Sequence, residues 1–495
     1  MKRKRLAAWF LSAFMLISAM PSQALAYEME VPGKQVSGES VGTEASGQET
    51  RESPSRETVL EEEGFIYRVD GERVMITGWT GSQKDLVIPD TIEEKPVTEI
   101  ASGAFANGTI LETVTLPAQE VTIREKAFEN CGNLRQVKVQ RNIKNIERLA
   151  FTGCDALTSV VLGTEVSGVP THSDGAAFGT ALTEFLAEEG NPDLESLDGV
   201  LYQKENSEEE QEKTLLCYPI NRPGEEYMVE NGTKVLGQYA IAGCFQLKRL
   251  SISSSIQDWD DSISEMPVLE EVILEEGMEF PHFVYGDLFR ECQALKILDV
   301  RSEGEICESL GSVPALEEVR IGRSVTNLDF KELDWLRDAA SYTVESENPA
   351  YQVLEGALCD YEGRLLRYPG GKKDAQYHVP DSITYIEEKA FADNDNLVSL
   401  TMGDQVKGIG ERAFARCSVL TEIQLSKGLK ELGDECFWEC SALLSLELIS
   451  QEEDFDLGDR LLDSCSSLKS VSFDVNAQVK LECFSSAPLL ETATF

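Results

Sequence analysis

Histidine and basic residues are scarce in this chain of 495 residues. The three histidines, His172, His282 and His378, lie far apart, so the sequence offers no histidine pair for a metal site or a catalytic triad. Lys and Arg number 44 against 88 Asp and Glu, which gives a formal net charge of −44. Nucleic acids and anionic membrane surfaces are bound through basic patches, so we expect neither as a partner.

Long apolar runs are missing except at the N-terminus. Lys2–Arg5 form a positive segment, Leu6–Met20 form an apolar run, and Ala24–Ala26 supply a small-residue cleavage site. The run is shorter than the ~20 apolar residues that a transmembrane helix needs. We therefore interpret residues 1–26 as a secretory signal peptide and expect no membrane insertion after its removal. Residues 27–60 are rich in Ser, Gly and Glu without apolar periodicity, which predicts a disordered acidic linker.

Motifs of known catalytic and cofactor chemistry are also missing. The sequence has no Cys-x-x-Cys pair, and no G-x-S-x-G elbow, Walker loop or Rossmann fingerprint occurs in a fitting context. The acidic stretches Glu208–Glu210 and Asp393–Asp395 lack the spacing of an EF-hand loop. We therefore expect no enzyme activity, no cofactor and no metal site.

What the sequence does contain is one unit that recurs along most of its length. Its signature is Ala-Phe-x-x-Cys-x-x-Leu, and we call its phenylalanine the anchor. The clearest copies begin at Ala127, Ala150, Ala413 and, with cysteine replacing alanine, Cys436. Degenerate copies place the anchor at Phe105, Phe178, Ile241, Ile263, Phe289, Leu310, Leu333, Phe391, Leu462 and Phe484. Most of these fourteen anchors lie 21 to 27 residues apart, which indicates a repeat architecture.

Each copy continues into a short segment in which apolar and polar residues alternate. In the first such segment the alternation predicts a strand whose Val114 and Leu116 face the core. Thr113 and Thr115 of the same strand then face outward. A second apolar pair precedes the next anchor and predicts another short extended piece. Since no copy can bury its apolar edge alone, the copies must stack, which predicts a mainly β solenoid.

Residues Val406–Leu425 combine these features as Val-x-x-Ile-x-x-x-Ala-Phe-x-x-Cys-x-x-Leu-x-x-Ile-x-Leu. This pattern resembles the BspA-like leucine-rich repeat of bacterial secreted and surface proteins. The resemblance implies a leucine-rich-repeat-like solenoid over residues 104–495, with about 14 repeats of ~23 residues. Two segments, about 191–230 and 348–380, share Asn-Pro and a later Tyr-Pro and resemble the β-hairpin inserts of that family. Residues 61–103 resemble its N-terminal β cap.

The 12 cysteines are distributed according to the repeat. Seven of them share the slot three residues after the anchor: Cys131, Cys154, Cys244, Cys292, Cys417, Cys440 and Cys465. This slot calls for a small, buried, weakly polar side chain, which a thiol supplies. We interpret the cysteines as free core thiols. One or more disulfides remain the alternative, because the chain carries a secretion signal.

The outward positions of the predicted strands are the natural binding surface of such an array. They are rich in Ser and Thr, mildly charged and free of aromatic residues, whereas binding hot spots favour Trp, Tyr and Arg. One stretch is less uniform because apolar residues occur among its charges. We take it as a candidate ligand patch, made of Glu271, Ile273, Ile297, Asp299, Glu318 and Arg320. The alternative is an ordinary solvated sheet face.

The family resemblance implies a non-catalytic secreted or cell-surface protein for adhesion and ligand binding. BspA-like proteins are associated with bacterial attachment to host matrix proteins and to other cells. We expect an extracellular protein or glycan as partner, and a monomer. A structural surface spacer and a secreted enzyme with an unrecognised site are the alternatives. The sequence stops at Phe495 within a predicted strand. We expect either that a partner or membrane-proximal structure covers this strand or that the true end lies elsewhere.

Free core thiols predict a simple count. When the mature protein is unfolded in guanidinium chloride without reductant, a thiol reagent should react with all 12 cysteines. A reduced sample supplies the reference value. A count far below 12 in the unreduced sample would contradict the interpretation and indicate disulfides.

Overall fold

In a computed structural model, the chain divides into two units, residues 1–56 and 57–495. The structure describes residues 60–172, 175–204, 212–259, 261–277, 289–301, 316–328, 339–450, 455–475, 481–484 and 486–494. The predicted signal peptide and all but one residue of the predicted linker lie outside these ranges, as do the anchors Leu310 and Leu333. The remaining linker residue, Leu60, begins the first strand, β1 (Leu60–Glu62).

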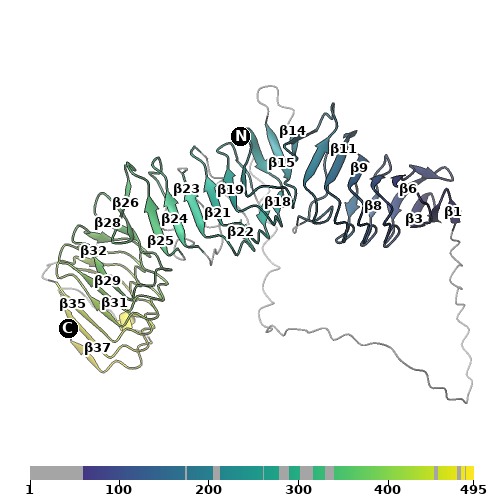
Figure 1. The fold of residues 1–495 in the computed structure, drawn as a ribbon. Helices are drawn as coiled ribbons and strands as arrows, with labels where there is room; N and C mark the ends of the chain where they lie inside the picture. The colour runs from purple at the N-terminus through teal and green to yellow at the C-terminus, as the bar shows by residue number, and fades with distance from the viewer. Residues whose placement is uncertain are drawn as a thin grey trace, which may run out of the picture. The chain divides into compact units, whose positions relative to one another are not determined.

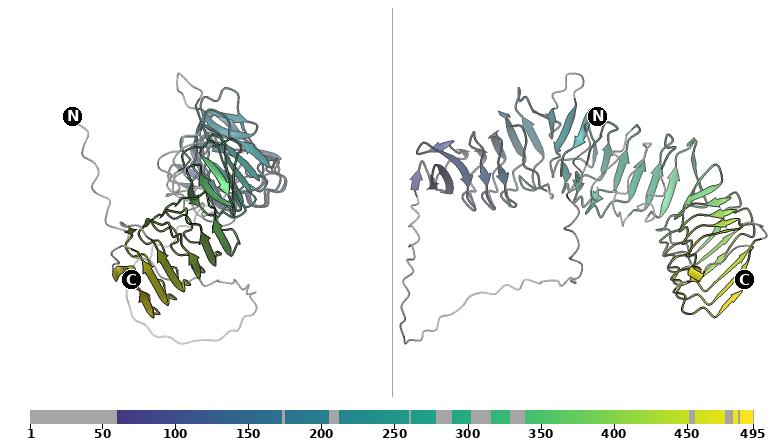
Figure 2. Two further views of the ribbon diagram at one scale, coloured as in Figure 1. Left: turned by 90° about the vertical axis from the view of Figure 1, so that its left-hand side faces the viewer. Right: turned by 180° about the vertical axis from the view of Figure 1, so that it is seen from behind.

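One strand of each turn is the longer one, and neighbouring long strands pair in parallel. We call these strands the long-strand column. In the described part of the chain they form four sheets of five, six, three and three strands, whose strands lie side by side in Figure 1 and in the right-hand view of Figure 2. The first two sheets contain β4 (Asp85–Val87), β7 (Thr113–Thr115), β9 (Gln136–Arg141), β11 (Ser159–Glu165), β12 (Glu184–Ala187), β16 (Glu226–Met228), β19 (Arg249–Ile252), β21 (Glu271–Leu274), β23 (Ile297–Val300), β24 (Glu318–Ile321) and β25 (Ser341–Val344). The other two contain β29 (Gln376–Val379), β31 (Ser399–Met402), β33 (Glu422–Gln424), β35 (Ser445–Ile449), β37 (Ser470–Asp474) and β38 (Thr492–Thr494).

A second column of mostly two-residue strands follows the other edge of the turns. It contains β6 (Lys95–Ile100), β8 (Thr122–Ile123), β10 (Asn145–Ile146), β17 (Thr233–Leu236), β30 (Tyr385–Ile386), β32 (Gly408–Ile409), β34 (Glu431–Leu432) and β36 (Asp456–Leu457). In the middle of the chain, three anchors start short parallel strands of their own: β18 (Ile241–Ala242), β20 (Ile263–Ser264) and β22 (Phe289–Arg290). Among the described residues, the helical element is η3 (Leu481–Phe484), and no helix is long and apolar enough to cross a membrane.

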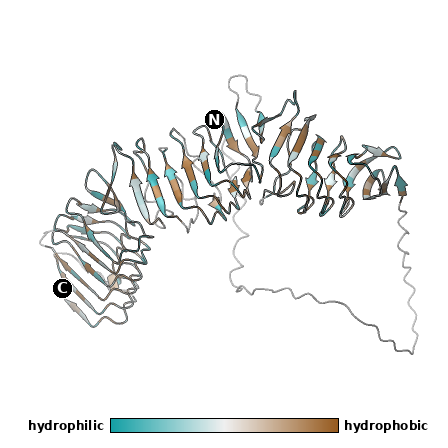
Figure 3. Ribbon diagram, viewed as in Figure 1, coloured by the Kyte–Doolittle hydropathy of each residue, from teal (hydrophilic) through white to brown (hydrophobic). Residues whose placement is uncertain are grey.

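Alternation along the long strands builds the core, as the sequence predicts. Val114 and Leu116 are 0% and 1% exposed, whereas Thr113 and Thr115 on the opposite face of the strand are only half-buried. Hydrophobic and hydrophilic residues accordingly alternate along the strands in Figure 3. The predicted mainly β solenoid is confirmed, with about 16 turns and almost no helix.

The Ala-Phe turns connect each turn of the solenoid to the next. The backbone N–H of Phe128 donates to the carbonyl of Ala150 at 2.9 Å, and that of Phe391 donates to Ala413 at 2.8 Å. The anchor rings stack at the same time. Phe128 lies 5.0 Å from both Phe105 and Phe151, with interplanar angles of 5° and 2°. Such ring pairs add about 0.5–1.5 kcal/mol each beyond their buried area, so the stack stabilises the register of the turns.

Two tyrosines fill the anchor position without the signature that marks the fourteen sequence anchors. The N–H of Tyr218 donates to Ala240 at 2.7 Å, and the N–H of Tyr368 donates to Ala390 at 2.8 Å, as the anchors do. The Tyr368 ring also stacks on Phe391, at 5.2 Å and 22°. These two tyrosines therefore act as anchors that the Ala-Phe-x-x-Cys signature does not identify.

Three antiparallel strands precede the parallel repeats at three places, and we call each group a three-strand module. The modules are β1, β2 (Phe65–Asp70) and β3 (Arg73–Trp79), then β13 (Leu194–Leu197), β14 (Val200–Lys204) and β15 (Lys213–Cys217), then β26 (Tyr351–Leu354), β27 (Ala357–Asp360) and β28 (Arg364–Arg367). The last strand of each pairs in parallel with β6, β17 or β30 of the short column. The strand β5 (Thr91–Ile92) pairs antiparallel with β6.

The three modules share their backbone in detail. Their first turns are Glu63-Gly64, Asp198-Gly199 and Glu355-Gly356, each with a φ near 50° followed by a φ of 80° to 88°. Two successive positive φ angles define a type I′ hairpin turn, which glycine accepts without steric cost. In every module the pairing register then shifts two to three residues after the glycine, for example between Leu201 and Tyr202. Apart from Leu60, the modules lie within the ranges for which the sequence predicts a cap and two inserts.

A buried asparagine locks the entry to each of the two internal modules. The amide nitrogen of Asn348 donates to the carbonyls of Gly322 and Val325 at 2.8 and 2.9 Å, and its oxygen accepts the N–H groups of Ala350 and Tyr351. Asn191 makes the equivalent four hydrogen bonds at the first internal module. Each asparagine therefore joins its own turn to the preceding one.

Asn348→Ala should lower the free energy of unfolding by about 3 kcal/mol, because it leaves two carbonyls and two N–H groups without their partner. Urea unfolding followed by circular dichroism measures the change. Asn145→Ala is the matched control, since Asn145 is exposed on β10 and should change stability by less than about 0.5 kcal/mol. Equal effects of the two substitutions would show that Asn348 does not lock the turn.

Candidate functional site

The six residues of the predicted ligand patch come together on three adjacent strands of the long-strand column. Glu271, Ile297 and Glu318 are direct neighbours across β21, β23 and β24. Ile273, Asp299 and Arg320 form the second row, two residues further along the same strands. All six belong to the outward face, because the residues between them, such as Val272 and Leu298, are buried in the core.

Three of the six are nevertheless almost fully covered. Glu271 and Ile273 are 7% exposed and Asp299 is 6% exposed. Glu271 is covered because Arg249 Nε lies 2.6 Å from its Oε2 and Arg320 Nη1 lies 2.8 Å from its Oε1. Arg320 reaches this carboxylate across the whole width of β23. The patch is therefore a compact polar surface rather than six separate exposed side chains.

Further ion pairs extend this surface in both directions. Arg320 Nη2 lies 2.9 Å from Glu318 Oε2, and the hydroxyl of Thr343 on β25 donates to Glu318 Oε1 at 2.9 Å. Arg301 Nη2 lies 2.8 Å from Asp299 Oδ2. We call Arg249, Glu271, Asp299, Arg301, Glu318 and Arg320 the charge network.

Several members of the charge network have shifted pKa values. Hydrogen bonding to Glu271 raises the pKa of Arg249, and hydrogen bonding to Glu318 raises the pKa of Arg320. Burial opposes the ionisation of Glu318, but the hydrogen bonds from Arg320 and Thr343 outweigh burial and lower the pKa of Glu318. These shifts all favour the charged forms of Arg249, Arg320 and Glu318, and the three arginines of the network balance its three carboxylates.

The cysteines behave as parts of the core. In the described part of the chain, eleven cysteines are present and all are free thiols. Cys131 donates to the carbonyl of the preceding anchor, Phe105, at 3.2 Å, and Cys440 donates to Phe414 at 3.0 Å. Burial raises the pKa of Cys292 to about 11 and that of Cys465 to about 12. The thiols of Cys292 and Cys465 therefore stay protonated at neutral pH, which makes them poor nucleophiles.

The histidines do not gather with these thiols. His172 Nε2 lies 2.7 Å from the carbonyl of Ile146, and His378 Nδ1 lies 2.9 Å from the hydroxyl of Thr401, while His282 lies outside the described residues. Within the described ranges, no three His, Cys, Asp or Glu side chains lie together in a group that could hold a metal ion.

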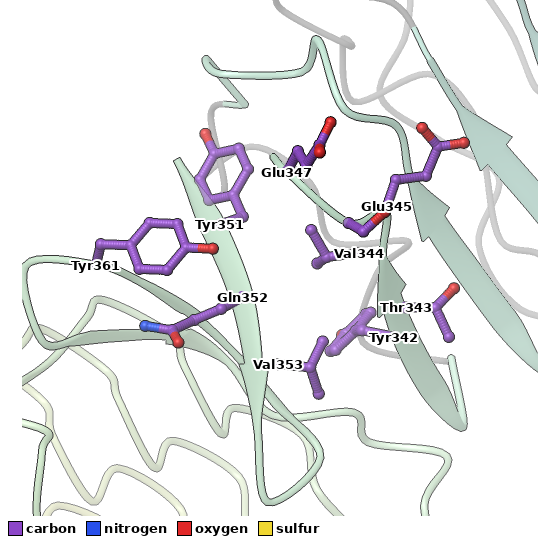
Figure 4. Close-up of a pocket in the computed structure, with 10 residues that line it drawn as sticks. Tyr342, Thr343, Val344, Glu345, Glu347, Tyr351, Gln352, Val353 and Tyr361 are labelled. Carbon is purple, nitrogen blue, oxygen red and sulfur yellow. The ribbon is translucent and has the colours of Figure 1, made fainter. Parts of the chain in front are cut away.

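A hollow of about 480 Å³ opens where β25 meets the third module (Figure 4). Val344 and Val353, both half-buried, line its base. Tyr351 and Tyr361 lie on one side, and Glu345 and Glu347 lie across from them. A second hollow of about 490 Å³, lined by Glu120, Arg141, Asn142 and Glu165, has no aromatic residue in its lining.

The sequence did not point to Tyr361, because the candidate patch was chosen from the outward positions of the repeat strands and Tyr361 lies in a module. Its ring is 59% exposed, which is a large exposed fraction for an aromatic side chain. One signal was available. The two internal modules align on Asn191 and Asn348, and this alignment places Tyr361 opposite Lys204, so the exposed aromatic residue is peculiar to one module.

Glu318→Gln should lower the free energy of unfolding by about 0.5–1 kcal/mol at pH 7, because it removes a charged partner of Arg320. The pKa of Glu318 is lowered in the folded state, so its stabilising effect is present above the pKa of the unfolded chain and is lost as the pH falls below about 4. The difference between parent and variant should therefore shrink from pH 7 to pH 3. Urea unfolding at several pH values measures it.

Glu317→Gln is the control for this experiment, because Glu317 is the exposed neighbour of Glu318 on the chain. It should have little effect at any pH. A Glu318→Gln effect of the same size at pH 3 and pH 7 would rule out the ionic contribution.

Comparison with known proteins agrees with this repeat architecture. The BspA type leucine-rich repeat region matches in 6 copies, over residues 79–191, 224–330 and 374–494. No curated protein sequence matches the chain.

Several solved structures are similar to the chain. A leucine-rich cell surface protein from Faecalibacterium prausnitzii is 17% identical, with 89% of this chain and 96% of that chain covered and a TM-score of 0.32. The pneumococcal vaccine antigen PcpA is 17% identical, with 85% and 82% covered and a TM-score of 0.33. A leucine-rich repeat protein from Bacteroides ovatus is 19% identical, with 88% and 94% covered and a TM-score of 0.29. The repeat match alone spans about two thirds of the sequence, and on that ground the chain belongs to the BspA-type leucine-rich repeat family.

Proposed function

We propose that this chain is a non-catalytic, secreted or cell-surface adhesion protein whose long-strand face binds an extracellular protein or glycan. Membership of the leucine-rich repeat family supports a role in protein binding. The signal-like residues 1–26 support export, and a similar F. prausnitzii protein is described as a cell surface protein. In this proposal the chain acts as a monomer, residues 27–60 act as the linker, and the modules act as cap and inserts.

The observation that carries the proposal is the charge network on the outward face. Most of its side chains are held by two neighbours before any partner arrives, as Glu271 is held by Arg249 and Arg320. A surface that is already ordered loses little side-chain entropy on binding. Arginine is also among the residues that carry most binding energy in protein interfaces. The predicted patch, Glu271 to Arg320, forms the centre of this proposed surface.

The test is binding of residues 27–495 to an array of extracellular-matrix proteins and glycans. Saturable binding to at least one of them is expected. No binding to any would overturn the proposal and favour a structural spacer, and hydrolysis of an arrayed substrate would favour an enzyme.

Glu318→Lys tests whether the patch takes part. It reverses a charge at the centre of the face and should weaken binding to the protein found on the array at least fivefold. Glu422→Lys is the matched control, because Glu422 is an exposed outward residue of β33 in the same long-strand column and lies outside the charge network. Glu271→Lys is less suitable, since a third cation between Arg249 and Arg320 would also destabilise the sheet. Equal binding by the Glu318 and Glu422 variants would exclude the patch.

A further inference from the structure

The hollow beside the third module differs in its lining from the hollow formed by Glu120, Arg141, Asn142 and Glu165. It combines an apolar base, an exposed aromatic ring and two carboxylates within about 480 Å³. We propose that it binds the side chain of a lysine or arginine presented by a partner protein. This inference rests on the proposed function, because it names the chemistry of the partner that the long-strand face would meet.

Comparison of the two internal modules separates what the fold needs from what it does not. Both have the same asparagine lock, the same type I′ turn and the same register shift, so the backbone makes equal demands on both. Aligned on those asparagines, Val344, Val353 and Tyr361 stand where the earlier module has Ala187, Ser196 and Lys204. The apolar and aromatic character of the hollow is therefore not required by the module.

The earlier module also shows what occupies the corresponding place when the tyrosine is missing. Its Lys204 donates from Nζ to the carbonyl of Asn191 at 2.7 Å, so a lysine of the chain itself lies over the turn. At the third module the corresponding residue is Tyr361, which carries no charge. A lysine of a partner protein would place a cation at this position instead.

The lining matches the two parts of such a side chain. The methylene stem of lysine or arginine packs on apolar surface while its charged end stays among polar groups. Val344 and Val353 provide the apolar base, and Tyr361 provides a ring at the rim that can attract a cation. Glu347 is exposed across the hollow from the two tyrosines and provides the countercharge. Glu345 is partly committed already, since its Oε2 accepts the N–H of Arg323 at 3.0 Å and lies 3.7 Å from Arg323 Nε.

Charge and position favour a basic protein over the other ligands. The carboxylates and the net charge of −44 disfavour an anionic ligand, and a neutral saccharide would use the ring without needing the carboxylates. The hollow also continues the proposed binding face. Thr343 lines the hollow and donates to Glu318 of the charge network, so one partner could contact both.

The experiment measures binding of a fluorescent hexalysine peptide to residues 27–495 by anisotropy at 20 and 150 mM salt. Saturable binding is expected, and Glu347→Gln and Tyr361→Ala should each weaken it about three- to tenfold. Tyr361→Phe should keep the parent affinity, because it retains the ring. Circular dichroism verifies that each variant is folded.

Two control variants match these changes elsewhere on the chain. Glu189→Gln removes one exposed carboxylate beside the earlier module, and Phe245→Ala removes another exposed ring, 49% exposed. Both should stay within about twofold of the parent. If Glu189→Gln weakens hexalysine as much as Glu347→Gln does, the peptide binds to the overall negative charge and the proposal fails.

A glycan array run with the same proteins separates this inference from the proposed function. Binding of a neutral oligosaccharide that is lost in Tyr361→Ala and in Tyr361→Phe would overturn the lysine assignment in favour of a saccharide. Binding of a matrix protein that none of the hollow variants changes would overturn the inference and leave the proposed function standing. Hexalysine binding that the hollow variants weaken, without binding to any matrix protein or glycan, would support the lysine site and overturn the proposed function.

Discussion

Everything in this protein depends on the contact between one turn of the solenoid and the next. A turn of about 23 residues exposes both of its edges, and neither has a partner within the same turn. The anchor N–H donates to a carbonyl of the following turn, the anchor rings stack at about 5 Å, and the cysteine thiols donate back to the preceding anchor. These three contacts converge on one small region of each turn. That convergence explains why the Ala-Phe-x-x-Cys signature survives where the rest of the repeat varies.

The three-strand modules change the solenoid without breaking it. Each module interrupts or precedes the long-strand column, while its last strand continues the short column in parallel. In the two internal modules a tyrosine, Tyr218 or Tyr368, takes over the anchor position, so the stack of turns stays continuous. The modules therefore place irregular backbone on the surface at no loss to the core. They also introduce side chains, such as Tyr361, that the Ser/Thr-rich outward positions of the repeats do not provide.

The carboxylates of the chain have different surroundings in the charge network and in the hollow beside the third module. Between β19 and β24 the carboxylates and arginines are so closely paired that Glu271 and Asp299 are nearly buried, and the surface is ordered but close to neutral. At the neighbouring hollow, Glu347 faces an aromatic rim instead of an arginine. The first arrangement favours shape-specific contact with low entropy cost, and the second favours a cation. The two arrangements adjoin at Thr343, which lines the hollow and donates to Glu318 of the charge network.

The sequence was sufficient to predict the fold class, the repeat, the alternation of core and surface residues and the slots of the buried cysteines. All of these follow from periodicity, because a residue that recurs every turn must occupy the same place in each. The sequence also predicts that the six patch residues share one face, because residues two apart on a strand point to the same side. Three features became visible only in the folded chain: Arg320 spans β23 to reach Glu271, Tyr218 and Tyr368 act as anchors, and the three modules share one backbone. These depend on side-chain reach and backbone turns between residues distant in sequence. A period of 23 residues carries no information about such contacts.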